Sequence, residues 1–288
     1  MRVLITGAGG YIGSLLTWHL LSKDHDVTAV DTTLAALAPF VGDVRLTLIH
    51  ADANSEELLR LVPEHDAIVP LAAIVGAKAC EEQPELAEKT NLEAVTRLNE
   101  ARGDRRVVFV TTDSGYRSDP GGRVDEDSPF EPVSLYARTK HAAEQALLAQ
   151  GNATSFRLGS VYGVSYRMRH DLLLHFLVRH AVLGVPKPLT DAPITRSFVH
   201  VNDVVAKIGY ALSSPYPTPS NVAAESTTKR DLATLIENEV PGYKFLADVE
   251  GADSDKRDFV LGTKHYAYFK HVGLRAGIQE LIRYYDTY

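Results

Sequence analysis

The sequence predicts an α/β fold in which helices cover both faces of a mostly parallel sheet, with a smaller α+β lobe attached. Short apolar, β-branched runs alternate with helical stretches over the first 112 residues, as is typical of parallel strands buried between helices. Proline and glycine become frequent beyond about residue 160, where this pattern changes. We therefore expect a doubly wound unit over 1–160, to which some later segments return, and a lobe formed mainly by 161–288.

The expected elements follow in order along the chain. Strands are predicted at 2–6, 26–30, 45–50, 66–72 and 106–110. Helices are predicted at 11–23, 84–103 and 134–151, and in the second lobe at 171–184, 201–212 and 229–240. Ser134 is the expected N-cap of the third helix, and Gly151 lies just past its end.

Composition indicates a soluble, cytoplasmic protein. The 288 residues are 45% apolar, enough to bury a sizeable core. The net charge of -7 gives no general affinity for nucleic acid or an anionic membrane. No run reaches the about 18 apolar residues of a membrane span, and the N-terminus is typical of a strand and not of a signal peptide. The single cysteine, Cys80, fits a reducing compartment and is expected as a small buried residue.

The segment TGAGGYIG joins the first strand to the first helix and places glycines at Gly7, Gly10 and Gly13. This G-x-x-G-x-x-G spacing differs from the strict G-x-G-x-x-G fingerprint. The physical role is the same, because a turn without side chains lets backbone N–H groups approach a diphosphate at a helix N-terminus. A tight strand-to-helix turn also favours glycine, so the glycines alone are weak evidence.

Asp31 ends the second strand about 20 residues beyond the loop, where a carboxylate accepts hydrogen bonds from the adenosine ribose hydroxyls. Thr32 and Thr33 follow, with no basic residue for a 2′-phosphate, which favours NAD over NADP. The alternative is that Asp31 is an acid that only caps a loop. Asp52 could reach the adenine, although an Asp-Ala-Asn turn needs no ligand to explain it.

Tyr136 and Lys140 lie four residues apart on a predicted helix and therefore share one face. A neighbouring ammonium lowers the pKa of a phenol, which would make Tyr136 a usable base near neutrality. Thr112, at the end of the fifth strand, would face the same crevice, because parallel sheets bind ligands beyond the carboxyl ends of their strands. The alternatives are a solvated helix face, and hydroxyls that only satisfy the backbone at a strand end.

These motifs together resemble the extended short-chain dehydrogenase/reductase family. The resemblance rests on TGAGGYIG, Asp31, LAA at 71–73, Asn91 in KTNLEAV, TTDSGY, YARTK, FRLGSVYG and RSFVHVNDV, which occur in the family's order and spacing. It implies a Rossmann-type fold, a catalytic set of Thr112, Tyr136 and Lys140, and no metal. It implies NAD bound by Gly7, Gly10, Tyr11, Ile12, Gly13, Asp31, Asp52, Ala53, Leu71, Ala72 and Ala73, together with Tyr136 and Lys140.

The resemblance also implies a nucleoside-diphosphate sugar as substrate and a homodimer formed by the helices that contain KTNLEAV and YARTKHAAEQ. The substrate site would include Thr112, Asp113, Ser114 and Ser160, and the arginines suit bidentate phosphate recognition: Arg167, Arg169, Arg196 and Arg257. Two positions depart from the family. Ser114 replaces the glutamate of the 4,6-dehydratases, which argues against dehydration because serine is a poor general base; Ser160 replaces a common asparagine.

Further segments resemble a bacterial subgroup that includes 4-dehydrogenases of GDP-linked D-glycero-α-D-manno-heptose in capsule synthesis: LAAIVGAKAC, TTDSGY, GVSYRMRHDLL, TTKRDL and DSDKRDF. We therefore expect an NAD-dependent oxidoreductase acting at C4 of a nucleotide-activated sugar. A 4-epimerase with no net redox change would use the same first half-reaction. The sequence is also compatible with a non-catalytic dinucleotide sensor, or with an oxidoreductase of a free hydroxy acid or sugar.

Overall fold

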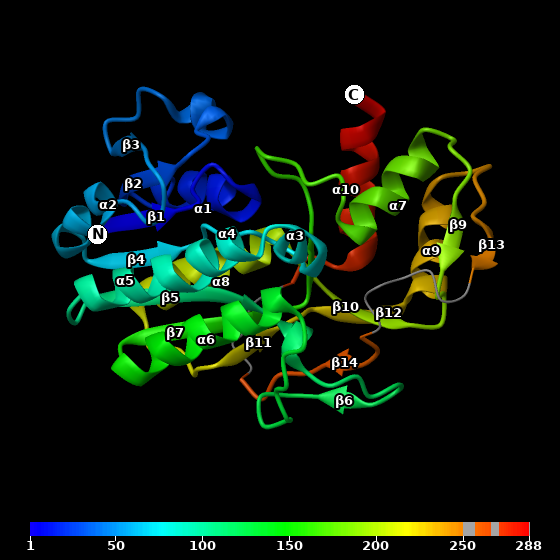
Figure 1. The fold of residues 1–288 in the computed structure, drawn as a ribbon. Coiled ribbons are helices and arrows are strands. Elements are labelled where there is room, and N and C mark those ends of the chain that lie inside the picture. The colour runs from blue at the N-terminus through cyan, green and yellow to red at the C-terminus, as the bar shows by residue number, and fades with distance from the viewer. Residues whose placement is uncertain (250–256, 266–270, 288) are drawn as a thin grey trace.

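The computed structural model describes residues 1–249, 257–265 and 271–287. Figure 1 shows a large sheet flanked by helices on one side of the molecule and a smaller helical lobe on the other. The strands are β1 (Arg2–Thr6), β2 (Asp26–Asp31), β3 (Leu46–His50), β4 (Ala67–Pro70), β5 (Arg106–Thr112), β6 (Arg123–Val124), β7 (Ala153–Leu158), β8 (Ser160–Tyr162), β9 (Pro188–Thr190), β10 (Thr195–His200), β11 (Ser220–Val222), β12 (Glu225–Thr228), β13 (Leu246–Val249) and β14 (Val260–Leu261).

The α-helices are α1 (Tyr11–Leu21), α2 (Glu56–Leu61), α3 (Ala77–Glu82), α4 (Pro84–Glu88), α5 (Ala94–Ala101), α6 (Leu135–Gln150), α7 (Leu173–Val182), α8 (Val201–Ser213), α9 (Lys229–Glu239) and α10 (Leu274–Thr287). Short 3₁₀ turns occupy Ala35–Phe40, Val62–Glu64 and Asp113–Gly115. The predicted helix over 84–103 is interrupted by a π-helical turn at Lys89–Glu93 between α4 and α5. Helix α10 was not predicted.

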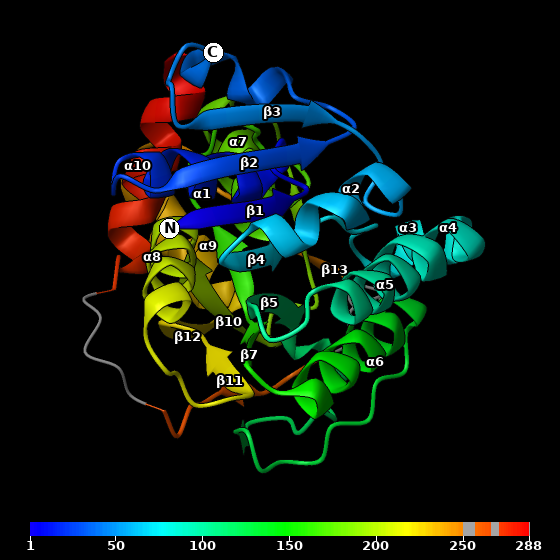
Figure 2. The ribbon, with the colours of Figure 1, turned by 90° about the vertical axis from the view of Figure 1, so that its left-hand side faces the viewer.

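The larger sheet confirms the expected Rossmann-type fold. Within the described residues it has seven strands in the order β11-β7-β5-β4-β1-β2-β3, and every neighbouring pair is parallel. Figure 2 shows the strands stacked in this order, with α2, α5 and α6 on one face and α1 and α8 on the other. Helix α8 and strand β11 belong to this layer although they lie beyond residue 160.

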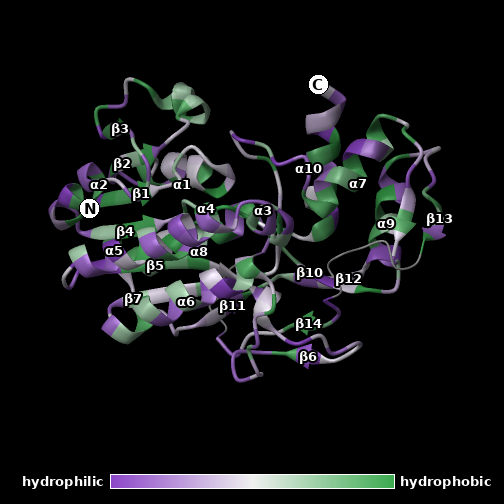
Figure 3. Ribbon diagram, in the orientation of Figure 1, coloured by the Kyte–Doolittle hydropathy of each residue, from purple (hydrophilic) through white to green (hydrophobic). Residues whose placement is uncertain are grey.

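Successive side chains of the central strands point to opposite faces of this sheet, and a hydrophobic core forms on each face. Val3 and Ile5 of β1 pack into the cluster formed with α1 and α8, whereas Leu4 between them packs into the cluster formed with α5 and α6. Strands buried on both faces are apolar throughout, and Figure 3 shows the inner strands mostly in the hydrophobic colour. The sheet is therefore held rigidly from both sides.

The second lobe has its own core beside the carboxyl edge of the sheet. Strand β10 pairs in parallel with β8 and antiparallel with β12, and α7, α9 and α10 pack around them. Tyr162, Leu177, Phe198, Leu232 and Ile278 are buried at the centre of this core. These contacts place β8 and β10 next to the strand ends of the large sheet.

Helix α6 begins and ends as its sequence predicts. The Ser134 hydroxyl accepts a hydrogen bond from the Ala137 N–H, and Gly151 ends the helix with φ +80°. Further along the helix, the Glu144 carboxylate is fully buried and forms an ion pair with Arg157 of β7, with Nη2 to Oε2 at 2.7 Å. The Ser155 hydroxyl donates a further bond of 2.6 Å to Glu144. This pair fixes α6 on the sheet.

Glu144→Gln tests this attachment, with Glu100→Gln as its matched control. Removing one partner of a buried pair leaves the Arg157 charge uncompensated, so we expect a loss of about 3–5 kcal/mol in the free energy of unfolding. Glu100 is exposed on α5, which packs beside α6, and its change should stay within about 0.5 kcal/mol. Urea unfolding followed by circular dichroism measures both. Equal stability of the two variants would contradict the proposed attachment.

Candidate functional site

The glycine turn between β1 and α1 leaves no room for side chains. Gly7 has φ +71°, and a Cβ added to it would lie 2.5 Å from the Ala72 backbone nitrogen. A Cβ on Gly13 would lie 2.1 Å from the Gly7 carbonyl oxygen. The turn is thus pressed between the start of α1 and the segment after β4, with the N–H groups of the first helical turn at its edge.

The carboxylate of Asp31 faces this turn from the end of β2. It accepts hydrogen bonds from the Gly9 N–H and the Thr33 N–H, both at 2.9 Å. The carboxylate of Asp52 accepts a bond of 2.8 Å from the Asn54 N–H in the turn after β3. Both carboxylates therefore accept hydrogen bonds from the backbone, as acids that cap a loop or a turn do. Both also line the cavity described next.

One cavity of about 1090 Å³ runs along the carboxyl edge of the sheet and under the second lobe. It brings together nearly all the residues that the sequence assigned to cofactor or substrate: Gly7, Gly10, Tyr11, Ile12, Gly13, Asp31, Asp52, Ala53, Leu71, Ala72, Ala73, Thr112, Asp113, Tyr136, Lys140, Ser160, Arg167, Arg169, Arg196 and Arg257. Among the residues that the structure describes, Ser114 is the exception. Its hydroxyl lies 2.9 Å from the Thr112 Oγ1, and it does not line the cavity.

The chemical environment of Tyr136 and Lys140 differs from the prediction. Burial raises the pKa of Tyr136 to about 12, with Cys80 and Asp113 adding to the increase and Arg169 and Arg257 opposing it. Burial lowers the pKa of Lys140 to about 7, against the carboxylate of Glu144. The expected net lowering of the pKa of Tyr136 is therefore not found in the protein alone, because desolvation outweighs the opposing charges of Arg169 and Arg257. The Lys140 ammonium lies 3.9 Å over the Phe109 ring.

Asn91 is a site residue whose role was not predicted from sequence. It is fully buried in the π-helical turn. Its side chain accepts from the Ile74 N–H at 2.8 Å, donates to the Ile74 carbonyl at 3.0 Å and donates to the Thr139 hydroxyl at 3.4 Å. Asn91 thus ties the cavity segment after β4 to the helix that carries Tyr136 and Lys140.

The four arginines occupy different positions in the cavity wall. Arg167 is exposed, and Arg169 forms a bidentate pair with Asp171 at 2.7 and 2.5 Å. Arg196, largely buried on β10, donates to the Arg257 carbonyl. Arg257 forms an ion pair with Asp113, directly after Thr112.

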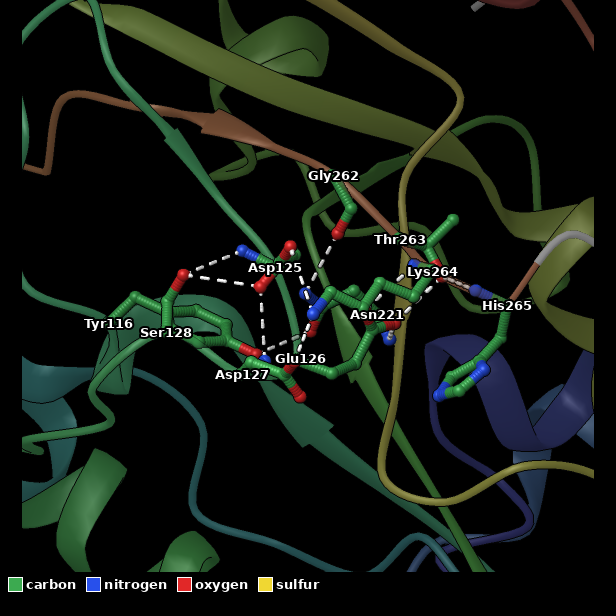
Figure 4. A network of polar contacts seen from close by, with 10 residues as sticks. All are labelled: Tyr116, Asp125, Glu126, Asp127, Ser128, Asn221, Gly262, Thr263, Lys264 and His265. Carbon is green, nitrogen blue, oxygen red and sulfur yellow. Dashed lines mark hydrogen bonds and ion pairs between the residues drawn. The ribbon is translucent and has the colours of Figure 1, made fainter.

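A polar network anchors the segment 257–265 that carries Arg257 (Figure 4). The Glu126 carboxylate accepts bonds from the Asn221 N–H at 2.8 Å, the Thr263 hydroxyl at 2.7 Å and the Lys264 N–H at 2.9 Å. The Asn221 side chain donates to the Gly262 carbonyl at 2.8 Å and accepts from the Tyr116 hydroxyl at 2.8 Å. The segment is therefore joined to β11 and to the loop between β5 and α6.

These features fit a dinucleotide. The turn at Gly7 and Gly13 has no space for a Cβ, it lies at a helix N-terminus, and the Asp31 carboxylate stands beside it, as a diphosphate and an adenosine ribose require. Within the described ranges 1–249, 257–265 and 271–287, no group of three or more His, Cys, Asp or Glu residues is arranged to hold a metal ion. No described helix is long and apolar enough to cross a membrane.

Lys140→Met tests the effect of the buried Lys140 on stability. The unfolded chain keeps this lysine protonated up to about pH 10.4. Below about pH 7 the folded protein must bury the charged ammonium, and the penalty to the free energy of unfolding is complete. As the pH rises above about 7 the folded state loses this proton, and the penalty decreases. Measured without NAD, the variant should gain about 3 kcal/mol in the free energy of unfolding at pH 6, and less at pH 9.

Lys78→Met is the control for this variant, because Lys78 is exposed and forms a surface pair with Glu82. Its effect should be small and similar at both pH values. Thermal and urea unfolding at pH 6 and pH 9 measure both variants. A loss of stability in Lys140→Met at pH 6 would show that the buried ammonium is a net stabiliser.

Comparison with known proteins identifies the family of this chain. The model of the family described as "NAD dependent epimerase/dehydratase family" matches residues 3–223. The chain is 31% identical to "Uncharacterized UDP-glucose epimerase YtcB" of Bacillus subtilis over 83% of this chain and 82% of that protein. It is 30% identical to the UDP-glucose 4-epimerase of Mycolicibacterium smegmatis over 71% of each chain.

Among solved structures, the chain resembles MoeE5 in complex with UDP-glucose and NAD. The TM-score is 0.84 at 27% identity, and the match covers 99% of this chain and 98% of that one. The family match spans the large sheet from β1 to β11 and includes the glycine turn, Thr112, Tyr136 and Lys140. The chain therefore belongs to the NAD dependent epimerase/dehydratase family.

Proposed function

We propose that the protein is a nucleotide-sugar 4-epimerase that oxidises C4 of its substrate and reduces it again on the other face. The observation that supports this proposal is the shared cavity, which is lined by Thr112, Tyr136 and Lys140 together with the glycine turn and the arginines. The names of the relatives, two of them UDP-glucose epimerases, support an epimerase with a UDP-sugar substrate.

In this proposal each residue has the chemical role that the family resemblance implies. When bound along the glycine turn, Asp31, Asp52 and the 71–73 segment, NAD supplies the hydride acceptor and, in its oxidised form, a positive charge. The Tyr136 phenolate takes the proton of the C4 hydroxyl, and Thr112 donates a hydrogen bond to the same oxygen. Lys140 holds the nicotinamide ribose and stabilises the phenolate.

The raised pKa of Tyr136 means that this residue needs positive charge before it can act as a base near neutral pH. Arg169 and Arg257 already lower the pKa, so they contribute to this activation from the substrate side. Arg167 and Arg196 supply further guanidinium groups, which suit a diphosphate. We propose that these four arginines bind the nucleoside diphosphate.

A 4,6-dehydratase is less consistent with the site. Position 114 is a serine whose hydroxyl pairs with Thr112 and does not line the cavity, and serine is a poor general base. Asp113 is present, but it is held by Arg257. Position 114, where the 4,6-dehydratases carry a glutamate, therefore offers no base to remove a proton next to the ketone.

A 4-dehydrogenase acting on a GDP-linked manno-heptose is a second candidate. Its support is the resemblance of segments such as GVSYRMRHDLL to that subgroup, and Arg167, Arg169 and Asp171 of this segment line the cavity. Both candidates share the oxidation at C4. They differ in whether the 4-keto sugar leaves the site.

One experiment separates the candidates. The purified protein with NAD is incubated in turn with UDP-glucose, UDP-galactose, GDP-mannose and GDP-heptose, while NADH absorbance and sugar NMR are recorded. A C4-inverted sugar without net NADH supports the epimerase, and NADH with a 4-keto product supports the dehydrogenase. NAD binding without turnover of any sugar would favour a dinucleotide sensor and contradict the proposal.

Tyr136→Phe should lower kcat on the active substrate by about 10²–10⁴-fold, because it removes the proton acceptor. Affinity for NAD should change little. Tyr210→Phe is the matched control, since Tyr210 is exposed on α8 and does not line the cavity. Unchanged kcat in Tyr136→Phe would refute the proposed chemistry.

We also propose a homodimer formed by the helices on the α5 and α6 face. Arg138, Ala142 and Gln145 are exposed along α6. Helix α4, whose Leu86 is 42% exposed, lies on the same side of the sheet (Figure 2). Small residues such as Ala142 allow helices to approach closely.

The single buried Cys80 is consistent with a reducing, cytoplasmic location.

Light scattering should give about twice the 31.5 kDa mass of the chain. Ala142→Arg should reduce that mass to the monomer value without unfolding, because the added side chain would separate the two α6 helices. A dimer that persists in Ala142→Arg would place the interface elsewhere.

A further inference from the structure

The segment 163–169 follows β8, precedes α7 and carries Arg167 and Arg169 into the cavity wall. We call it the arginine loop. Its shape decides where the two guanidinium groups lie relative to Tyr136, with which Arg169 interacts electrostatically. The question is what fixes a loop that has no helix or strand of its own.

His175 of α7 holds both ends of the arginine loop. This side chain is completely buried. Its Nε2 accepts a hydrogen bond from the Gly163 N–H at 2.9 Å, and its Nδ1 donates to the Arg169 carbonyl at 2.8 Å. The arginine loop therefore begins and ends on one imidazole ring.

The two partners define the charge and tautomer of this ring. A carbonyl only accepts and an N–H only donates, so Nδ1 carries the proton and Nε2 is bare. A protonated ring could not accept from Gly163. Burial lowers the pKa of His175 to about 4, which agrees with a neutral ring at physiological pH.

The arginine loop is also fixed from the cofactor side. The Tyr11 hydroxyl donates to the Gly163 carbonyl at 2.8 Å, and the Ser165 hydroxyl donates to the Tyr11 carbonyl at 2.6 Å. The ring of Tyr11 packs edge-on against His175 at 5.8 Å between centroids. Tyr11 is the first residue of α1 and belongs to the glycine turn.

We propose that His175 is a positioning residue that, with Tyr11, holds the arginine loop in the shape that presents Arg167 and Arg169 to the diphosphate of the substrate. The proposal rests on the proposed function for the identity of that ligand. In this proposal the arginine loop connects the glycine turn to the arginines that bind the sugar nucleotide. His175 itself does not touch the substrate.

Two substitutions of His175 test this role. His175→Leu removes both hydrogen bonds, whereas His175→Gln keeps an acceptor near the position of Nε2. We expect the KM for the active nucleotide sugar to rise about 10-fold or more in His175→Leu and less in His175→Gln, with NAD affinity within about a factor of two. Tyr11→Phe should raise KM in the same direction.

His180→Leu is the matched control. His180 lies on the same helix and donates from Nδ1 to the Phe176 carbonyl at 2.8 Å, without contacting the arginine loop. It should leave KM unchanged. Circular dichroism and thermal unfolding first establish that each variant folds.

A readout without turnover keeps this test separate from the proposed function. Binding of inorganic pyrophosphate to the NAD-saturated protein is measured by calorimetry, and hydrogen exchange of the 163–169 amides is measured by mass spectrometry. In His175→Leu we expect weaker pyrophosphate binding and faster exchange. A folded His175→Leu variant with wild-type pyrophosphate affinity and exchange would overturn the proposal, even if no sugar substrate is found.

Discussion

The parallel pairing of β1, β4 and β5 is the constraint on which the site depends. Thr6 of β1 is in register with Pro70 of β4, and Ala67 of β4 with Arg106 of β5. Because the three strands run the same way, the segments that follow them emerge along one edge. The glycine turn, the 71–73 segment and Thr112 thereby meet, and the core on both faces of the sheet keeps them in place. Helix α6 carries Tyr136 at that edge and is attached to β7 by the Glu144–Arg157 pair.

That attachment is electrostatic, and the site contains several charges that are costly to bury. The charge of Glu144 is compensated by Arg157. Lys140 lies near the Phe109 ring and, one helical turn away, the same Glu144 carboxylate. Burial of an incompletely compensated ammonium opposes folding. The same desolvation brings the pKa of Lys140 close to neutrality. The buried Lys140 ammonium thus lowers the stability of the protein without ligand.

Local spacing explains what could be predicted from the sequence. The glycine turn, Asp31 at the end of β2, Thr112 at the end of β5 and the Tyr136–Lys140 pair each depend on residues close together in the chain. Glu126 could not be assigned in this way, because it accepts a hydrogen bond from a backbone N–H 138 residues away. His175 could not be assigned either, because its two backbone partners belong to a loop without regular secondary structure. The pKa of Tyr136 depends on burial, which spacing does not reveal. Helix α10 was missed although Leu274, Ile278, Leu281 and Tyr285 follow a helical period.

Strand β11 has a consequence for how the chain reaches its native state. It covers the outer edge of β7, yet it is supplied by residues 220–222, after β8, α7, β9 and β10 of the second lobe. During synthesis the nascent first half exposes an unpaired strand edge until this late segment leaves the ribosome. Truncation near residue 160 should therefore produce an aggregating fragment, and the two halves are obliged to fold as one cooperative unit.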